Sequence, residues 1–120
     1  MQIRKGTADD LSLIRDLTKR ATDSTYFIEG MGDSAAKTVA AYVAKSTDVF
    51  QHALGSDNHS VYVATADEHL LGYVIAIHES PEIDWIMVDP ASHGSGAGKA
   101  LMIAALDALA EHGARSNVRL

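Results

Sequence analysis

The feature that most constrains this chain is a strand-like segment that leads through a glycine-rich loop into a helix. Residues 82–88 read as a strand, and the loop that follows contains Gly94, Gly96 and Gly98 before Lys99 opens a helical pattern. The N-terminus of a helix has unsatisfied backbone N–H groups and partial positive charge, so a phosphate can bind there. Glycine lets an anion approach the backbone because it has no β-carbon. The sequence therefore predicts a strand–loop–helix unit that can bind a pyrophosphate.

Two well-known phosphate loops fit this segment poorly. The Walker A loop needs a serine or threonine after its lysine, whereas Ala100 follows Lys99 here. A dinucleotide-binding loop follows the first strand of alternating β and α units, whereas this loop follows three consecutive strand-like segments. A flexible turn without a ligand stays open as an alternative, because glycine triplets also occur in such turns.

The first half of the chain predicts a short strand and two helices. Residues 2–5 form the strand, and Thr7 with Asp10 has the spacing of a helix capping box. Two segments with helical spacing of apolar side chains follow, joined by a polar connection over residues 22–33 and ended by Gly55. The apolar faces of these helices consist of Leu11, Ile14, Leu17 and Ala21, and of Val39, Tyr42, Val43, Ser46, Phe50 and Ala53.

The second half predicts an antiparallel meander followed by a helix. The three strands cover residues 60–65, 70–78 and 82–88, and residues 66–69 form a hairpin loop. A helix after the glycine loop ends at Gly113, and residues 114–120 open one more strand. The apolar face of this helix consists of Leu101, Met102, Ala105, Leu106 and Leu109. We expect an α+β domain with a mixed sheet in the order β-α-α-β-β-β-α-β, whose last strand pairs in parallel through a right-handed crossover.

Composition narrows the class of protein. The 120 residues favour a single domain over 1–120, and the net charge of −6 argues against binding to nucleic acid or to anionic membranes. The chain has no cysteine and no pair of histidines four residues apart, so we expect no disulfide and no metal site. Without a signal-peptide pattern or an apolar run long enough to span a bilayer, we expect a cytoplasmic protein.

Several motifs together resemble the Gcn5-related N-acetyltransferase (GNAT) family. Val88-Asp89-Pro90 matches the end of the family's fourth strand, and residues 93–98 match its coenzyme loop in register. Residues 3–10 resemble the family's first strand and helix, and the hairpin over residues 62–77 contains a matching Leu-Gly-Tyr. The resemblance covers essentially the whole chain. It implies the acyl-CoA N-acyltransferase fold and acetyl-CoA as the co-substrate.

The resemblance also implies which residues bind the coenzyme. The backbone of the fourth strand and the glycine loop would do so, and these residues are Ile86, Met87, Val88, His93, Gly94, Ser95, Gly96, Ala97, Gly98 and Lys99. His93 departs from the family, which usually has arginine or glutamine at this position. A neutral imidazole can donate one hydrogen bond but lacks the guanidinium charge, so we expect weaker coenzyme binding.

Acetyl transfer to an amine needs a base and an oxyanion donor. Glu82 matches the position of the base in many members, and we expect Asp84 to lie on the same face of the strand. The N–H of Val88 is the predicted oxyanion donor. His78 is an alternative base, and two solvated carboxylates without a catalytic role are the alternative for Glu82 and Asp84. The segment that includes Tyr26 and Phe27 lines the acceptor site in relatives.

Three functions stay open. The leading one is acetyl transfer from acetyl-CoA to the primary amine of a small molecule or peptide, and the second is a non-catalytic acyl-CoA sensor or interaction module. The third is a domain that is inert alone. Relatives usually have, on a helix after the fifth strand, a tyrosine that acts as the general acid for the leaving thiolate. This chain ends at Leu120 and has at most the start of that strand, so we expect a C-terminally incomplete domain. A homodimer that completes the sheet is a further expectation.

Overall fold

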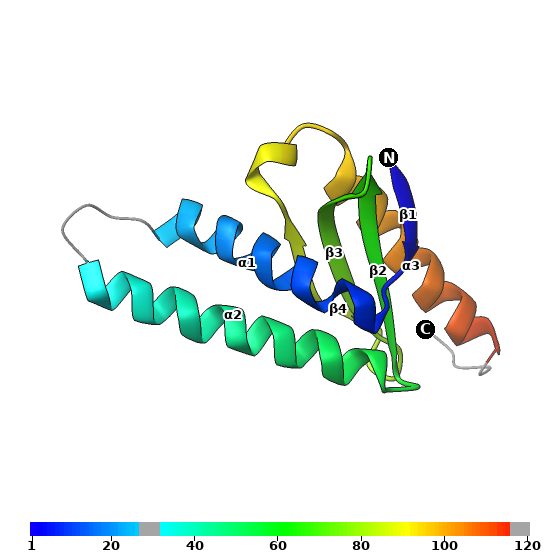
Figure 1. Ribbon diagram of the computed structural model, residues 1–120. Coiled ribbons are helices and arrows are strands. Elements are labelled where there is room, and N and C mark those ends of the chain that lie inside the picture. The colour runs from blue at the N-terminus through cyan, green and yellow to red at the C-terminus, as the bar shows by residue number, and fades with distance from the viewer. Residues whose placement is uncertain (27–31, 116–120) are drawn as a thin grey trace.

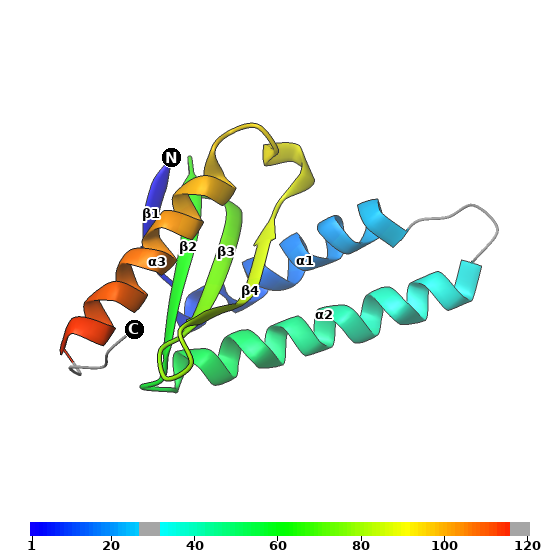
Figure 2. The same ribbon diagram turned by 180° about the vertical axis from the view of Figure 1, so that it is seen from behind.

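A four-stranded sheet lies between two layers of helices in the computed structural model, which describes residues 1–26 and 32–115 (Figures 1 and 2). The helices α1 and α2 form an antiparallel pair on one face, and α3 covers the other face. The elements are β1 (Gln2–Lys5), α1 (Leu11–Tyr26), α2 (Gly32–Leu54), β2 (His59–Ala66), β3 (His69–Ile77), β4 (Glu82–Val88) and α3 (Ala97–Arg115). This arrangement confirms the predicted α+β class.

The sheet is fully antiparallel over the described residues, in the order β1-β2-β3-β4. The predicted meander and its hairpin loop are therefore confirmed. Asp67 and Glu68 form the two-residue turn between β2 and β3, with φ angles of 50° and 67°. Positive φ at both positions matches the right-handed twist of the flanking strands.

Two hydrophobic cores lie on the two faces of the sheet. The larger core joins Ile14 and Leu17 of α1 to Phe50 of α2 and to the inner side chains of β2 and β3, while Leu101 of α3 packs in the second core. The predicted apolar faces of α1 and α2 agree with this packing. Leu106 is a correction, because 53% of its surface is exposed.

The ends of the helices differ from the sequence prediction. Helix α1 continues to Tyr26 and α2 begins at Gly32, so the connection is shorter than residues 22–33. Helix α3 passes through Gly113 and ends at Arg115, because a glycine near a helix end costs only about 1 kcal/mol relative to alanine. The predicted last strand is therefore wrong at its first two residues, and the remainder, 116–120, lies outside the described residues.

The connection from β1 to α1 confirms the predicted capping box. A 3₁₀ turn over Ala8–Asp10 precedes the helix, and the N–H of Thr7 donates to Oδ2 of Asp10 at 2.8 Å. Both guanidinium Nη atoms of Arg4 also donate to this carboxylate, at 2.9 and 2.7 Å. Burial raises the pKa of Asp10, but the Arg4 and Thr7 hydrogen bonds outweigh it and hold that pKa below its usual value.

Among the described helices, none combines the length and apolar character that crossing a bilayer requires.

Candidate functional site

The glycine loop adopts a conformation that only glycine takes easily. After a short 3₁₀ turn over Pro90–Ser92, Gly94 and Gly96 have φ angles of +88° and +86°, and α3 begins at Ala97. A β-carbon added at either glycine would meet nothing within 4 Å. The protein itself therefore leaves open space above both residues, and their backbone conformation is the local reason for glycine.

Backbone donors at the start of α3 face this open space. The N–H of Ala97 donates to the hydroxyl of Ser95 at 3.3 Å, and the first bond inside the helix runs from Ala100 N–H to Gly96 O at 3.0 Å. The N–H groups of Gly98 and Lys99 belong to the first turn, which has no acceptors of its own. Their partial positive charge suits an anion.

A hollow of about 490 Å³ lies over the loop. It brings together most of the coenzyme-binding residues that the sequence predicts. The lining consists of Val88, Ser92, His93, Gly94, Gly96, Ala97, Gly98 and Lys99. Ser95 does not line the hollow, and its hydroxyl accepts from the N–H of Ala97. The side chains of His93 and Lys99 are exposed beside the hollow, within the region where a phosphate would bind.

The backbone of β4 presents its donors in alternation. The N–H of Asp89 donates to the carbonyl of Leu71 in β3 at 2.8 Å. In an antiparallel pair the backbone groups of alternate residues point the same way, so Met87 also faces β3. The N–H groups of Ile86 and Val88 then point to the other edge, which pairs with no strand among the described residues. Of the three predicted backbone contacts, the open edge therefore offers Ile86 and Val88.

A β-bulge at Asp84 interrupts the alternation of β4. Trp85 pairs with Ile75 and Ile83 pairs with Ala76, which leaves Asp84 as the extra residue. As a result, Ile83 packs against the α3 core while Trp85 packs against the α1–α2 core. The prediction that Glu82 and Asp84 share a face assumed regular alternation, and because the bulge interrupts that alternation at Asp84 it stays a prediction.

Glu82 and Val88 lie at opposite ends of β4. A strand rises about 3.3 Å per residue, so six steps separate their α-carbons by roughly 20 Å. Glu82 is exposed, and its carboxylate accepts from the hydroxyl of Ser80 at 3.2 Å. A base and an oxyanion donor must both reach one carbonyl group, so these two residues cannot serve the same reaction centre.

His78 is engaged within the protein. Its Nδ1 donates to the carbonyl of Asp57 at 3.2 Å, and its Nε2 lies 2.6 Å from the hydroxyl of Ser60. Its ring also stacks on that of His112, with centroids 4.0 Å apart. Both ring nitrogens therefore have protein partners, which argues against the alternative that His78 is the base.

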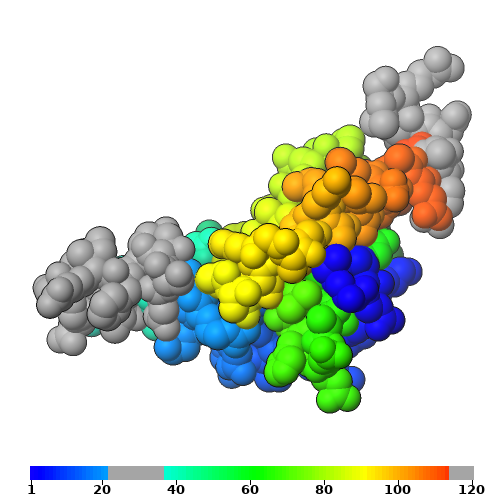
Figure 3. All heavy atoms as spheres, turned by 90° about the horizontal axis from the view of Figure 1, so that it is seen from above, coloured from blue at the N-terminus to red at the C-terminus, as the bar shows by residue number. Residues whose placement is uncertain are grey.

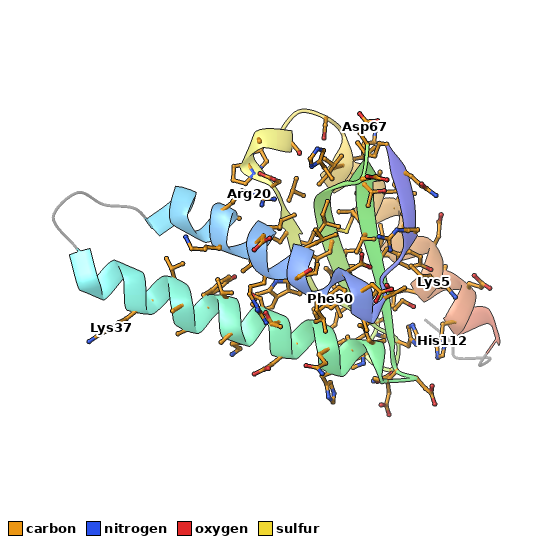
Figure 4. The ribbon with its side chains drawn as sticks, in the orientation of Figure 1. Lys5, Arg20, Lys37, Phe50, Asp67 and His112 are labelled. Carbon is orange, nitrogen blue, oxygen red and sulfur yellow. The ribbon has the colours of Figure 1, made fainter. Side chains whose placement is uncertain are left out.

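Sequence reasoning missed an ion pair beside the loop. Asp89 Oδ2 accepts from Nη2 of Arg20 at 2.8 Å and from its Nε at 3.2 Å, while Oδ1 accepts from the N–H of Ala91 at 3.0 Å. Figure 4 shows Arg20 reaching from α1 toward this turn. An aspartate before proline is itself a turn signal, but no sequence signal links it to Arg20.

The predicted acceptor segment is only partly described, because Phe27 and the side chain of Tyr26 lie outside the described residues. Within the described part of the chain, no three histidine, aspartate or glutamate side chains are grouped so that they could hold a metal ion.

A model of the acetyltransferase (GNAT) family matches residues 17–120. The chain belongs to this family. No curated protein matches it. The GNAT resemblance that the motifs indicated is therefore confirmed over most of the chain.

Solved structures of other family members share the fold. PaiA N-acetyltransferase from Thermoplasma acidophilum, in complex with coenzyme A, is 17% identical with a TM-score of 0.73, over 93% of this chain and 73% of that one. A GCN5-related N-acetyltransferase from Rhodopseudomonas palustris is 16% identical with a TM-score of 0.68, over 93% and 67%. The structure of AAC(6')-Iy with the bisubstrate analog CoA-S-monomethyl-acetylneamine is 22% identical with a TM-score of 0.59, over 98% and 74%.

Proposed function

We propose that this GNAT protein transfers the acetyl group of acetyl-CoA to a primary amine. The observation that carries the proposal is the glycine loop at the start of α3, which offers backbone donors beside an unpaired edge of β4. Membership of the family supports it. Two of the similar structures contain coenzyme A or an analog built on it, which supports the choice of co-substrate.

The coenzyme would bind along a path that the described residues offer. Its pyrophosphate lies over the N–H groups of Gly98 and Lys99, with the side chains of Lys99 and His93 at the rim of the hollow. The pantetheine arm then follows the open edge of β4 and accepts hydrogen bonds from the outward N–H groups of Val88 and Ile86. This path leads from the loop toward the acidic end of the strand.

The reaction is direct attack of the amine on the thioester. The amine nitrogen forms a bond to the carbonyl carbon, the carbon–sulfur bond breaks, and coenzyme A leaves as a thiolate that takes a proton. Glu82 accepts the proton of the attacking amine through water, and Asp84 at the bulge is the second candidate for this role.

The oxyanion donor follows from distance. With the base on Glu82 or Asp84, the N–H of Ile86 is the outward donor nearer to the reaction, and Ile86 is 38% exposed. Val88, near the glycine loop, then holds the coenzyme arm instead of the oxyanion. Ile86 therefore replaces Val88 as the proposed oxyanion donor, because Val88 lies too far from Glu82 for both to reach one carbonyl group.

For the acceptor we propose a small-molecule or peptide amine. The net charge of −6 favours a cationic substrate, because negative surface raises the local concentration of amines. The bisubstrate analog bound to AAC(6')-Iy contains an acetylneamine group, which supports the small-molecule class. A second copy of the chain that completes the sheet beyond the coenzyme arm is also proposed, because β4 is an edge strand among the described residues.

Calorimetry with acetyl-CoA and a thermal melt test the proposal first. We expect saturable heat and a rise in melting temperature, because a ligand that binds only the folded state stabilises it. Absence of both at millimolar coenzyme would contradict the proposal.

Substitution of the base then tests the chemistry. We expect Glu82→Gln to lower turnover by roughly 10²-fold while coenzyme affinity stays near that of the unmodified protein. Glu79→Gln is the matched control, because Glu79 is an exposed acid three residues earlier. Equal turnover of both variants would remove Glu82 as the base and leave Asp84→Asn as the next test.

A non-catalytic acyl-CoA sensor is the second candidate. It is favoured by His93, which gives the loop less positive charge than the family's usual arginine. Coenzyme binding without acetyl transfer to any amine in a broad panel would favour the sensor over the enzyme.

A further inference from the structure

Asp89 connects three parts of the molecule at the entrance to the glycine loop. Its N–H donates to the carbonyl of Leu71 in β3, its Oδ1 accepts from Ala91, and its Oδ2 accepts from Arg20 in α1. Its side chain is only 13% exposed, whereas that of Arg20 is 52% exposed. The carboxylate is therefore held from two sides, one in its own turn and one in a helix 69 residues away in the sequence.

The backbone hydrogen bonds of the loop form a chain that begins at this residue. The N–H of Ser92 donates to the carbonyl of Asp89 at 2.8 Å, and the N–H of His93 donates to that of Pro90 at 3.3 Å. The N–H of Ser95 donates in turn to the carbonyl of Ser92 at 3.0 Å. A shift of Asp89 would therefore move each turn of the loop that precedes α3.

Helix α1 gives the pair a fixed support. Leu17 and Thr18 are fully buried, and the Thr18 hydroxyl lies 3.4 Å from the Tyr73 hydroxyl of β3. Arg20 is two residues further along the same helix. In the view from above, the segment that contains Asp89 lies against α1 on one side and continues toward α3 on the other (Figure 3).

We propose that the Arg20–Asp89 ion pair positions the coenzyme loop, with Asp89 as the positioning residue and Arg20 as its anchor on α1. This inference rests on the proposed coenzyme function. A β-carbon at Gly94 or Gly96 would meet no neighbouring atom, so no side-chain packing fixes the middle of the loop and its shape depends on its two ends. A loop already held in the binding conformation loses less entropy when the pyrophosphate binds.

Calorimetry of coenzyme A with four variants of the 120-residue chain tests the inference. We expect Asp89→Ala to weaken binding about tenfold, because the N–H of Ala91 and the Arg20 guanidinium both lose their acceptor. Arg20→Met and Asp89→Asn remove only the ion pair, so each weakens binding roughly threefold. Arg20→Lys keeps the charge and restores part of the loss.

The signature of a pair is non-additivity. We expect the Arg20→Met/Asp89→Asn double variant to bind coenzyme A within about twofold of Asp89→Asn alone. Arg15→Met and Asp48→Ala are matched controls, because both residues are exposed on α1 and α2, and we expect wild-type affinity from them. A thermal melt without ligand accompanies each titration to show that the variants are folded.

The outcomes separate this inference from the proposed function. If the wild-type chain binds coenzyme A and the folded Asp89→Ala variant binds it with the same affinity, the positioning role is overturned while the proposed function stands. Additive losses of affinity in the double variant have the same meaning. Absence of coenzyme binding by the wild-type chain overturns the proposed function and this inference with it.

Discussion

Two strand-to-helix connections of the chain differ in what satisfies the backbone N–H groups at the start of the helix. Between β1 and α1, the buried carboxylate of Asp10 accepts from Thr7 and from Arg4. Between β4 and α3, two exposed glycines in the left-handed region leave the space before the helix open. We call the first connection closed, because its own carboxylate satisfies its backbone donor. We call the second connection open, because its backbone donors are left for a ligand.

This difference distinguishes a helix start that stabilises the fold from a helix start that can bind a ligand. An aspartate that is 2% exposed at the third position of its turn places a negative charge where the turn needs it. Gly94 and Gly96 have positive φ and open space where a side chain would be, so packing does not explain the loop and another reason is needed. In a GNAT protein that reason is the proposed pyrophosphate.

The largest effect should come from the closed connection. We expect Asp10→Ala to reduce the free energy of unfolding by about 2–3 kcal/mol, because it removes a helix cap and the charged partner of Arg4. Urea denaturation measures this, with Asp9→Ala as the control because Asp9 is exposed. Coenzyme affinity of the folded variant should stay unchanged. A similar loss of stability in both variants would contradict the structural role of Asp10.

The open connection should respond in affinity more than in stability. We expect Gly96→Val to weaken coenzyme A binding about tenfold, because a β-branched residue at a φ of +86° forces the exposed loop into another conformation. Gly55→Ala is the control, since Gly55 lies outside the loop and its added β-carbon would lie 3.8 Å from the carbonyl oxygen of His52, an ordinary contact. If Gly96→Val bound coenzyme A normally, the loop would not form the pyrophosphate site.

Acid should weaken the closed connection selectively. The pKa of Asp10 in the folded protein lies below its value in the unfolded chain, so the unfolded chain takes up the proton first as pH falls. Its stabilising contribution is complete above the unfolded pKa, about 3.9, and is lost as pH decreases through the folded pKa. Urea denaturation between pH 6 and pH 3 should show a steeper loss for wild type than for Asp10→Ala. Parallel curves would contradict this prediction.

The smallest change sharpens the open connection. We expect His93→Arg to tighten coenzyme A binding by about two- to fivefold, because a permanent guanidinium charge strengthens a phosphate contact. Calorimetry at low and moderate salt measures it, and added salt should reduce the gain. His69→Arg, an exposed histidine in the β2–β3 hairpin, serves as the control. Equal gains from both variants would indicate a general charge effect.

The features that the sequence predicted correctly depend on short stretches of chain. The capping box of Thr7 and Asp10 spans four residues, and the pattern of the glycine loop is contained within six. Chain-distant contacts were not predictable in this way. The pairing of Arg20 with Asp89 exists because α1 packs beside β3 and β4, and no local pattern of either residue encodes it.

The end of each helix and the path of β4 were also beyond local reasoning. Gly113 reads as a stop signal, yet α3 continues past it for two residues. The bulge at Asp84 depends on how β4 pairs with β3, which the sequence of β4 alone does not show. The alternation of acidic and apolar residues in β4 therefore predicted a regular strand. The assignment of Glu82 and Asp84 to one face rested on that alternation and stays a prediction.

The same bulge has a consequence for anyone who redesigns β4. Ile83 and Trp85 are two residues apart yet pack against different cores. The side chains at every second position of β4 therefore change from one face of the sheet to the other at Asp84. A mutant library that randomised every second residue along the strand, Ile83 and Trp85 among them, would therefore disrupt both cores instead of one. Engineering of substrate preference should therefore choose positions separately on the two sides of Asp84.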